Sequence, residues 1–244
     1  MLLYQPYTTV KILPTYEQSE LSSDLFQYRS RSNYHLRYTK HVILPSSITT
    51  IPDETFYDYD VLEDINLRNI TQIGTKSFYG CKSLKTVQFS KDNDVTIGGF
   101  AFANCGLIDI EIPNTVKMIG ESAFINNYVT DYWSLENNAT SYREYLDYQE
   151  YINNHTGEEQ KTPSIESVSI NVSESGLVLG LNSFMVEDEC EVDICYGNEQ
   201  SVFIFTDKYE KTWQSSELTP EQLNRLTGIM HLQKNRGQYG IEWT

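Results

Sequence analysis

The chain has 244 residues, of which 39% are hydrophobic, and its net charge of −16 comes from 34 acidic and 18 basic residues. This length holds one extended repeat domain or two small domains. The negative charge repels phosphate backbones and anionic membranes, and no cluster of Lys or Arg offsets it, so the sequence argues against nucleic acid as a partner.

Residues 1–41 precede the regular part of the chain. Residues 8–12 and 34–44 alternate in polarity and are predicted to be strands. The first six residues lack the basic and long apolar regions of a signal peptide, and no apolar run in the chain is long enough to span a membrane. A stack of repeats exposes the core of its first unit unless something covers it. Residues 1–41 are therefore interpreted as an N-terminal cap, with an attachment arm for a larger assembly as the alternative.

Residues 42–127 contain four copies of one pattern. Each copy has an aliphatic pair and then a Phe within seven residues, and a six-residue run of alternating apolar and polar residues follows before the next copy. The phenylalanines are Phe56, Phe78, Phe102 and Phe124, at steps of about 22, 24 and 22 residues. These steps fall inside the range of about 20–29 residues that is typical of leucine-rich repeats. The longer step contains residues 91–94, which we interpret as a surface loop.

The alternating runs predict half-buried strands that stack with their equivalents in neighbouring repeats. Two inner columns are expected: Ile65, Val87 and Ile110, and beside them Leu67, Phe89 and Ile112. The residues between them must point out of the core. This places Asp64, Thr86 and Asp109 in one outward column, and Asn66, Gln88 and Glu111 in the next.

Two stretches carry a resemblance to a known family. Residues 70–89 read ITQIGTKSFYGCKSLKTVQF and residues 107–124 read LIDIEIPNTVKMIGESAF, with Ile-Gly-x-x-x-Phe in register in both. They resemble BspA-like leucine-rich repeats, over about four consecutive units and a looser echo later. The resemblance implies a strand-rich α/β repeat solenoid with irregular caps and one insertion. It also implies a non-catalytic scaffold that binds partners, in an extracellular or cell-surface setting.

Residues 128–163 interrupt the pattern and are rich in Asn, Tyr and acidic residues. Residues 141–153 show helical periodicity. The aromatic side chains of this insertion either pack on the repeats or form a sticky surface, since Tyr and Trp dominate interface hot spots. On the second interpretation Tyr132, Trp133 and Tyr145 are candidate binding residues.

The pattern resumes in degenerate form over residues 164–206. The run 165–170 predicts a strand, Leu177, Leu179 and Phe184 restate the aliphatic pair and the Phe, and further strands are expected at 191–195 and 201–206. In the C-terminal cap, residues 207–244, Thr219-Pro220-Glu221-Gln222 is a capping box with Pro at the first helical position. It predicts a helix that ends near Thr227, where Gly228 stops it. Residues 237–244 are expected to form a closing strand.

The sequence contains no recognisable catalytic, metal or cofactor motif. The histidines do not have metal-ligand spacing. The acidic stretches 92–94 and 187–191 lack the glycine turn of a calcium loop, so solvated acidic turns are expected. Cys81 and Cys105 occupy equivalent places in adjacent repeats, where a buried thiol packs as a small apolar group, and all four cysteines are expected to be reduced. No enzyme, metal or cofactor is predicted.

The favoured hypothesis is a recognition module that binds protein or glycan through the outward columns Asp64, Asn66, Thr86, Gln88, Asp109 and Glu111, or through the aromatic insertion. The alternative is a structural component of a larger assembly, such as a virion or a cell-surface array. The missing leader, the many tyrosines and the irregular ends favour this alternative.

Overall fold

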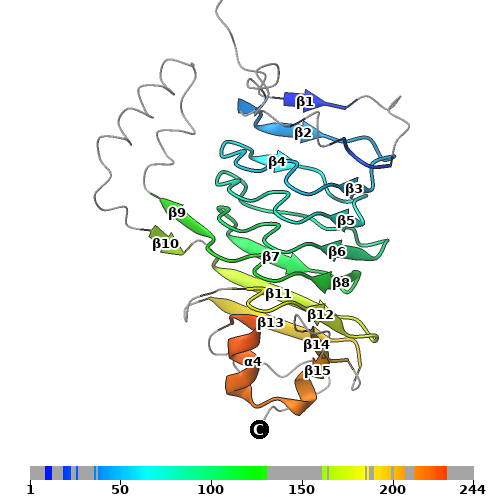
Figure 1. Ribbon diagram of the computed structural model, residues 1–244, viewed down its shortest axis with the longest axis vertical. Coiled ribbons are helices and arrows are strands. Elements are labelled where there is room, and N and C mark those ends of the chain that lie inside the picture. The colour runs from blue at the N-terminus through cyan, green and yellow to red at the C-terminus, as the bar shows by residue number, and fades with distance from the viewer. Residues whose placement is uncertain are drawn as a thin grey trace, which may run out of the picture.

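The computed structural model describes residues 9–12, 19–22, 26, 36, 38–130, 161–163, 165–184, 186, 190–198, 201–206 and 212–229. Short parallel strands of successive repeats stack along the long axis of the molecule (Figure 1). The helix predicted at 141–153 and the closing strand predicted at 237–244 lie outside the described residues.

The strands fall into two series on opposite sides of the core. The alternating runs and the N-terminal region contribute β1 (Thr9–Lys11), β2 (His41–Ile43), β4 (Asp64–Ile65), β7 (Asp109–Ile112), β11 (Ser167–Val172) and β13 (Glu191–Tyr196). The aliphatic pairs contribute β3 (Thr50–Ile51), β5 (Gln72–Ile73), β6 (Val95–Ile97), β8 (Val116–Ile119), β12 (Leu177–Leu179) and β14 (Phe203–Thr206), followed by β15 (Thr212–Gln214).

The first series forms two three-stranded sheets, β1-β2-β4 and β13-β11-β7, whose described pairings are all parallel. Between them, residues 84–89 make a single bridge, from Thr86 to Asp109. The second series forms a seven-stranded sheet in the order β15-β14-β12-β8-β6-β5-β3, in which only β15 is antiparallel. Strands β4 and β7 are shorter than the six-residue runs that predict them, because ladder pairing covers only part of each run.

The core lies between the two series. Both predicted inner columns are buried, with exposed fractions of 6% or less at Ile65, Val87, Ile110, Leu67, Phe89 and Ile112. The expected strand-rich repeat architecture is thus present. Residues 42–127 connect their strands through turns, because each Phe segment reverses direction within a few residues, as the repeat pattern predicts.

A stack of phenylalanine rings runs through the core. Phe56, Phe78, Phe102, Phe124 and Phe184 are fully buried, with successive ring centroids 5.1–5.4 Å apart and interplanar angles of 15° or less. Offset stacking of this kind adds to the burial of the rings. The expected column of phenylalanines is therefore confirmed, and it extends to Phe184.

The backbone around each Phe is held by a second set of hydrogen bonds. Residues with positive φ lie two positions before the ring (Glu54, Lys76, Phe100, Ser122, Asn182) and two positions after it (Asp58, Gly80, Asn104, Asn126). These turns point amides towards the next repeat, where Phe78 N donates to Ala101 O at 2.9 Å and Phe102 N to Ala123 O at 2.8 Å. The backbone amides and carbonyls of these buried turns are thus hydrogen-bonded between repeats and are not left unpaired in the interior.

Glycine follows the aliphatic pair in four repeats because successive backbones approach closely there. A Cβ on Gly98 would lie 2.6 Å from Thr75 N, and a Cβ on Gly74, Gly120 or Gly180 would likewise collide with backbone atoms of the preceding repeat. Only a residue without a side chain allows this spacing.

In residues 42–127, a buried donor three residues after each Phe of the stack bonds to the segment before it. Cys81 Sγ donates to Phe56 O at 3.2 Å, and Cys105 Sγ donates to Phe78 O at 3.0 Å. Tyr59 and Asn127 occupy the equivalent positions and donate to Phe26 O and Phe102 O. Cys81 and Cys105 are free thiols that fill equivalent places in the core, as their spacing predicts.

The insertion leaves the stack through a two-stranded stem and does not interrupt it. Strands β9 (Tyr128–Thr130) and β10 (Lys161–Pro163) pair antiparallel and project from one side of the repeats (Figure 1). Meanwhile β11 pairs directly with β7, and Phe124 N donates to Ser183 O at 2.9 Å. The repeats on either side of the insertion are therefore direct neighbours.

Both ends of the stack are covered by irregular segments. At the first repeat, Phe26 packs on Phe56 with ring centroids 4.7 Å apart, and Leu21 N donates to Thr50 O. At the last repeat, the 3-10 turn η2 (Ser215–Glu217) precedes helix α4 (Pro220–Thr227). Carbonyls at the end of α4 accept from the turn around Phe184, whose amide donates to Thr227 O at 2.9 Å.

The terminal predictions have mixed outcomes. Helix α4 is confirmed, with the capping box between Thr219 and Gln222 and a left-handed Gly228 at its end. The strand predicted at 34–44 forms only over His41–Ile43, as β2, and is wrong for the other described residues of that range, 36, 38–40 and 44. The partner β1 offers only three residues, and Thr39 N donates to Leu36 O in a turn just before β2.

Candidate functional site

The outward side of the first strand series, which we call the strand face, presents two rows of polar side chains. Register aligns the first row in two parts, Thr9, His41 and Asp64, and then Thr86, Asp109, Ser167 and Glu191; Asp64 and Thr86 hold equivalent places in consecutive repeats. The second row, two residues further along each strand or run, contains Lys11, Ile43, Asn66, Gln88, Glu111, Ser169 and Asp193.

All six strand-face residues proposed from the sequence are exposed: Asp64, Asn66, Thr86, Gln88, Asp109 and Glu111. The alternation that buries Ile65 and Leu67 forces their neighbours outwards. The structure therefore brings these six side chains together on one surface. Their role in binding stays a prediction.

Polar contacts between repeats hold several of these side chains in place. Arg68 donates to Gln88 Oε1 through Nε at 3.1 Å, Lys91 Nζ lies 2.8 Å from Glu111 Oε1, and Ser167 Oγ donates to Asp109 Oδ1 at 2.7 Å. These contacts are exposed, so they order the surface more than they stabilise the fold. The resulting face is predominantly acidic, with a few cations at its margin.

The sequence proposal left out part of this face. Ser167, Ser169, Glu191 and Asp193 continue both rows on β11 and β13, and the same alternation predicts their orientation. His41 and Ile43 extend the rows in the other direction, and Ile43 is 45% exposed. The contacts of Arg68 and Lys91 cannot be predicted from the local sequence, because each side chain contacts a residue about twenty positions away.

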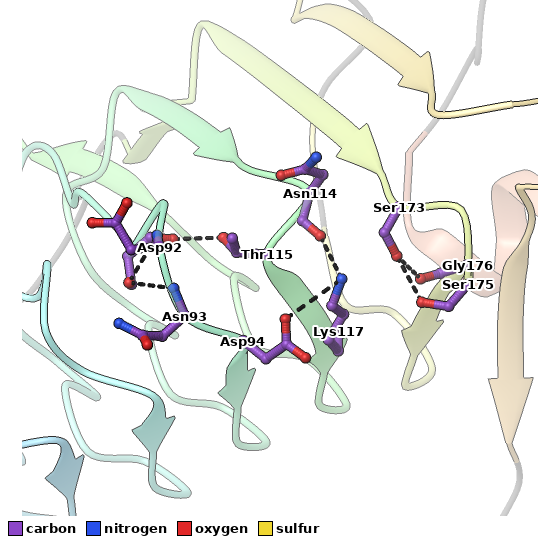
Figure 2. Close-up of polar contacts among 10 residues, drawn as sticks. Asp92, Asn93, Asp94, Asn114, Thr115, Lys117, Ser173, Ser175 and Gly176 are labelled. Atoms are coloured by element: carbon purple, nitrogen blue, oxygen red, sulfur yellow. Dashed lines mark hydrogen bonds and ion pairs between the residues drawn. The ribbon is translucent and has the colours of Figure 1, made fainter.

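The polar groups of the acidic segment 92–94 contact nearby residues of the chain. Figure 2 shows Lys117 directed at Asp94, with Lys117 Nζ 3.6 Å from Asp94 Oδ1, while Asp92 N donates to Ser90 Oγ. Among the described residues no group of three or more His, Cys, Asp or Glu side chains is arranged to hold a metal ion. The second acidic stretch, residues 187–189, lies outside them.

Burial raises the pKa of some of the cysteine thiols and so keeps them protonated. Burial is the main cause that raises the pKa of Cys81 well above its ordinary value, and the adjacent Cys105 thiol adds to it. The pKa of Cys190 is raised to about 11, mainly by burial and then by Glu191. A thiol is nucleophilic only as its thiolate, so these side chains have the character of structural groups.

The aromatic candidates Tyr132, Trp133 and Tyr145 lie outside the described residues, so only the stem of the insertion is placed. In the part of the chain that the structure describes, no helix is long and apolar enough to cross a membrane.

Comparison with known proteins identifies the repeats. The BspA type leucine rich repeat region matches residues 16–130 and 49–173, with six copies. The fold is similar to a leucine-rich repeat protein from Bacteroides ovatus ATCC 8483, at a TM-score of 0.40 and 16% identity over 82% of this chain. This chain covers 63% of that protein. None of the curated proteins matches the sequence.

The family match shows that the fold is a leucine-rich repeat, and the described residues are rich in strands and contain few helices. The chain belongs to the BspA-type leucine-rich repeat family, since the family match covers well over half of its residues.

Proposed function

We propose that the protein is a non-catalytic recognition module, a repeat solenoid that binds a protein or glycan partner through the strand face. The observation that carries the proposal is the pair of exposed polar rows on rigid, stacked strands. A stacked repeat array presents an extended binding surface of this kind. Membership of the BspA-type family supports partner binding and an extracellular or surface setting.

The charge of the rows favours a partner that carries positive charge. Asp64, Asp109, Glu111, Glu191 and Asp193 lie on one face, and only Glu111 among them has a Lys within ion-pair distance in the described structure. Complementary charge steers encounter and excludes wrong partners more than it raises affinity.

The test replaces Asp64, Asp109 and Glu111 together with Ala. All three are exposed, so the melting temperature should stay within a few degrees of the parent, because exposed polar positions contribute little to stability. Immobilised parent and variant are then compared for capture of proteins, identified by mass spectrometry, and for binding to a glycan array. The proposal predicts that partners of the parent are lost from the triple variant.

Two further variants serve as controls. Gln72→Ala lies on the seven-stranded sheet and should bind as the parent does. A second variant replaces Tyr132, Trp133 and Tyr145. If the strand-face variant still binds its partner and this aromatic variant does not, the insertion is the site and the strand face is not.

A further inference from the structure

The outward row of the seven-stranded sheet differs from the strand face in charge. Strand register aligns Thr50, Gln72, Thr96, Met118, Val178, Ile204 and Gln214 across the sheet. None of these seven side chains is charged, although 21% of the chain is charged and the strand face is acidic.

The middle of this row is apolar. Met118 is 41% exposed, one of the two exposed large hydrophobic residues among the described ones. Val178 and Ile204 are half-buried, while the residues on either side of each, such as Leu177 and Leu179, are completely buried. The exposure of Met118, together with the alternating burial of β12 and β14, shows that Met118, Val178 and Ile204 point away from the core, on the three adjacent strands β8, β12 and β14.

We propose that this row docks on the same row of a second copy of the chain, around a twofold axis through Val178. The row reads polar, apolar, apolar, apolar, polar from Thr96 to Gln214, so it is symmetric about Val178. A twofold axis there places Met118 opposite Ile204 of the other copy and Val178 opposite itself. An interface between identical copies needs this kind of self-complementary surface.

The charge of the chain limits which surface can meet a second copy. Two molecules that each carry −16 repel one another, and the repulsion at contact is smallest where the facing side chains are uncharged. Face-to-face packing of two sheets also suits a flat row of side chains. The contact leaves both acidic strand faces pointing away from each other, so it is compatible with partner binding there.

The first test measures association of the full chain by sedimentation velocity. One row gives a small interface, and small interfaces form weak complexes, so protein is examined from about 10 µM to about 1 mM. The parent should shift towards twice the chain mass as concentration rises. Met118→Lys should remain a single chain throughout. Ile43→Lys is the matched control, since Ile43 is similarly exposed on the opposite face, and it should associate as the parent does.

The second test addresses the symmetry. Met118→Lys and Ile204→Asp should each be single chains alone. An equimolar mixture should form a mixed dimer, because the introduced ammonium of one copy would face the introduced carboxylate of the other. A mixture of Met118→Lys with Ile204→Lys should remain single chains. If Ile204→Asp fails to fold, Val178→Lys mixed with Val178→Asp makes the same measurement at the axis itself.

Three outcomes would overturn the proposal. A parent that stays a single chain at every concentration excludes the second copy as the occupant. A Met118→Lys variant that still associates, or an Ile43→Lys variant that does not, moves the contact off this sheet. Charge-complementary mixtures that fail to associate exclude the twofold axis at Val178.

Discussion

At the scale of single residues, the phenylalanine of each repeat has the most demanding position. Its ring stacks on those of both neighbouring repeats, and its backbone lies between two residues of positive φ. A smaller side chain would leave a cavity that the surrounding rings cannot fill, because they are fixed by hydrogen-bonded turns.

Replacement of Phe102 by Ala should therefore strongly destabilise the folded protein. Its side chain is completely buried between Phe78 and Phe124, so we expect a loss of about 3–5 kcal/mol in unfolding free energy, from lost transfer energy plus the cavity. Denaturant titration followed by circular dichroism measures this. Met118→Ala, at an exposed position, is the control and should lie within about 0.5 kcal/mol of the parent. Equal stabilities for both variants would contradict the assigned register.

The residue pattern predicts the core well because burial has a strong local signature. Phe spacing and period-two alternation identify the phenylalanine stack and both inner columns. The positions of positive φ can be predicted only in part from the sequence. Gly80, Asn104 and Asn126 are residue types that favour positive φ, but Lys76 and Phe100 are not. At Lys76 and Phe100 tertiary hydrogen bonds hold the backbone at positive φ, and the local sequence does not predict it.

A second residue-scale prediction concerns pH. The folded pKa of Cys81 lies well above that of the unfolded thiol because of burial, so the folded state retains a proton that the unfolded state loses. The stability from this group is fully present below the unfolded pKa and falls as pH rises above it. The parent should therefore lose stability above about pH 9. Cys81→Ala should lose less over that range.

The check is a pair of denaturant titrations, at pH 7 and pH 10, for the parent and for Cys81→Ala. The stability difference between the two proteins should shrink at the higher pH. Cys195→Ala is the comparison variant: its thiol is partly exposed, and its pKa is also raised, by burial and then by Asp193, so its stability difference from the parent should shrink less than that of Cys81→Ala. A stability difference between the parent and Cys81→Ala that is the same at both pH values would show that the Cys81 thiol is not the group responsible.

At the scale of elements, the repeats before and after the insertion stack directly on each other although they are far apart in sequence. Strand β11 takes its place beside β7 although about fifty residues separate them, and Phe184 follows Phe124 in the stack. The neighbours meet because each repeat must bury an apolar face that it cannot bury alone.

The insertion should therefore be dispensable for folding. In the proposed variant an Asn-Gly turn replaces residues 131–160 and joins Thr130 to Lys161, the last pair of the β9–β10 stem. Asn-Gly suits the two-residue turn of an antiparallel hairpin. We expect a melting temperature within a few degrees of the parent, measured by differential scanning calorimetry. Phe124→Ala in the same background should still be strongly destabilised. Failure of the shortened chain to fold would show that the insertion supports the stack.

Element boundaries were less predictable than element types. The capping box identified α4, since its signals are local. Within the described part of the strand expected at 34–44, only β2 forms, because its ladder with β1 covers just three residues and the local pattern does not show how far that ladder extends. The outward row of the seven-stranded sheet could not be predicted from the sequence for a related reason. Each aliphatic pair leaves only one or two residues partly exposed, and only the register across repeats turns those residues into a surface.

At the scale of the whole molecule, the two outward surfaces carry different charge, and this gives the proposed self-association a distinctive response to salt. An uncharged contact between two copies is opposed only by the repulsion of their net charges of −16. Added salt screens this repulsion, since the screening length falls from about 30 Å at 0.01 M to about 10 Å at 0.1 M ionic strength. Self-association should therefore tighten as salt rises.

The measurement is sedimentation equilibrium of the parent at about 0.01 M and at about 0.5 M ionic strength, conditions on either side of strong screening. The variant in which Asp64, Asp109 and Glu111 are replaced by Ala has three fewer negative charges but an unchanged seven-stranded sheet. It should associate more tightly than the parent at low salt, and the two proteins should converge at high salt. Met118→Lys should remain a single chain in both. An association that weakens with salt would mean that ion pairs join the copies, and the contact would then involve the charged strand face instead of the uncharged row.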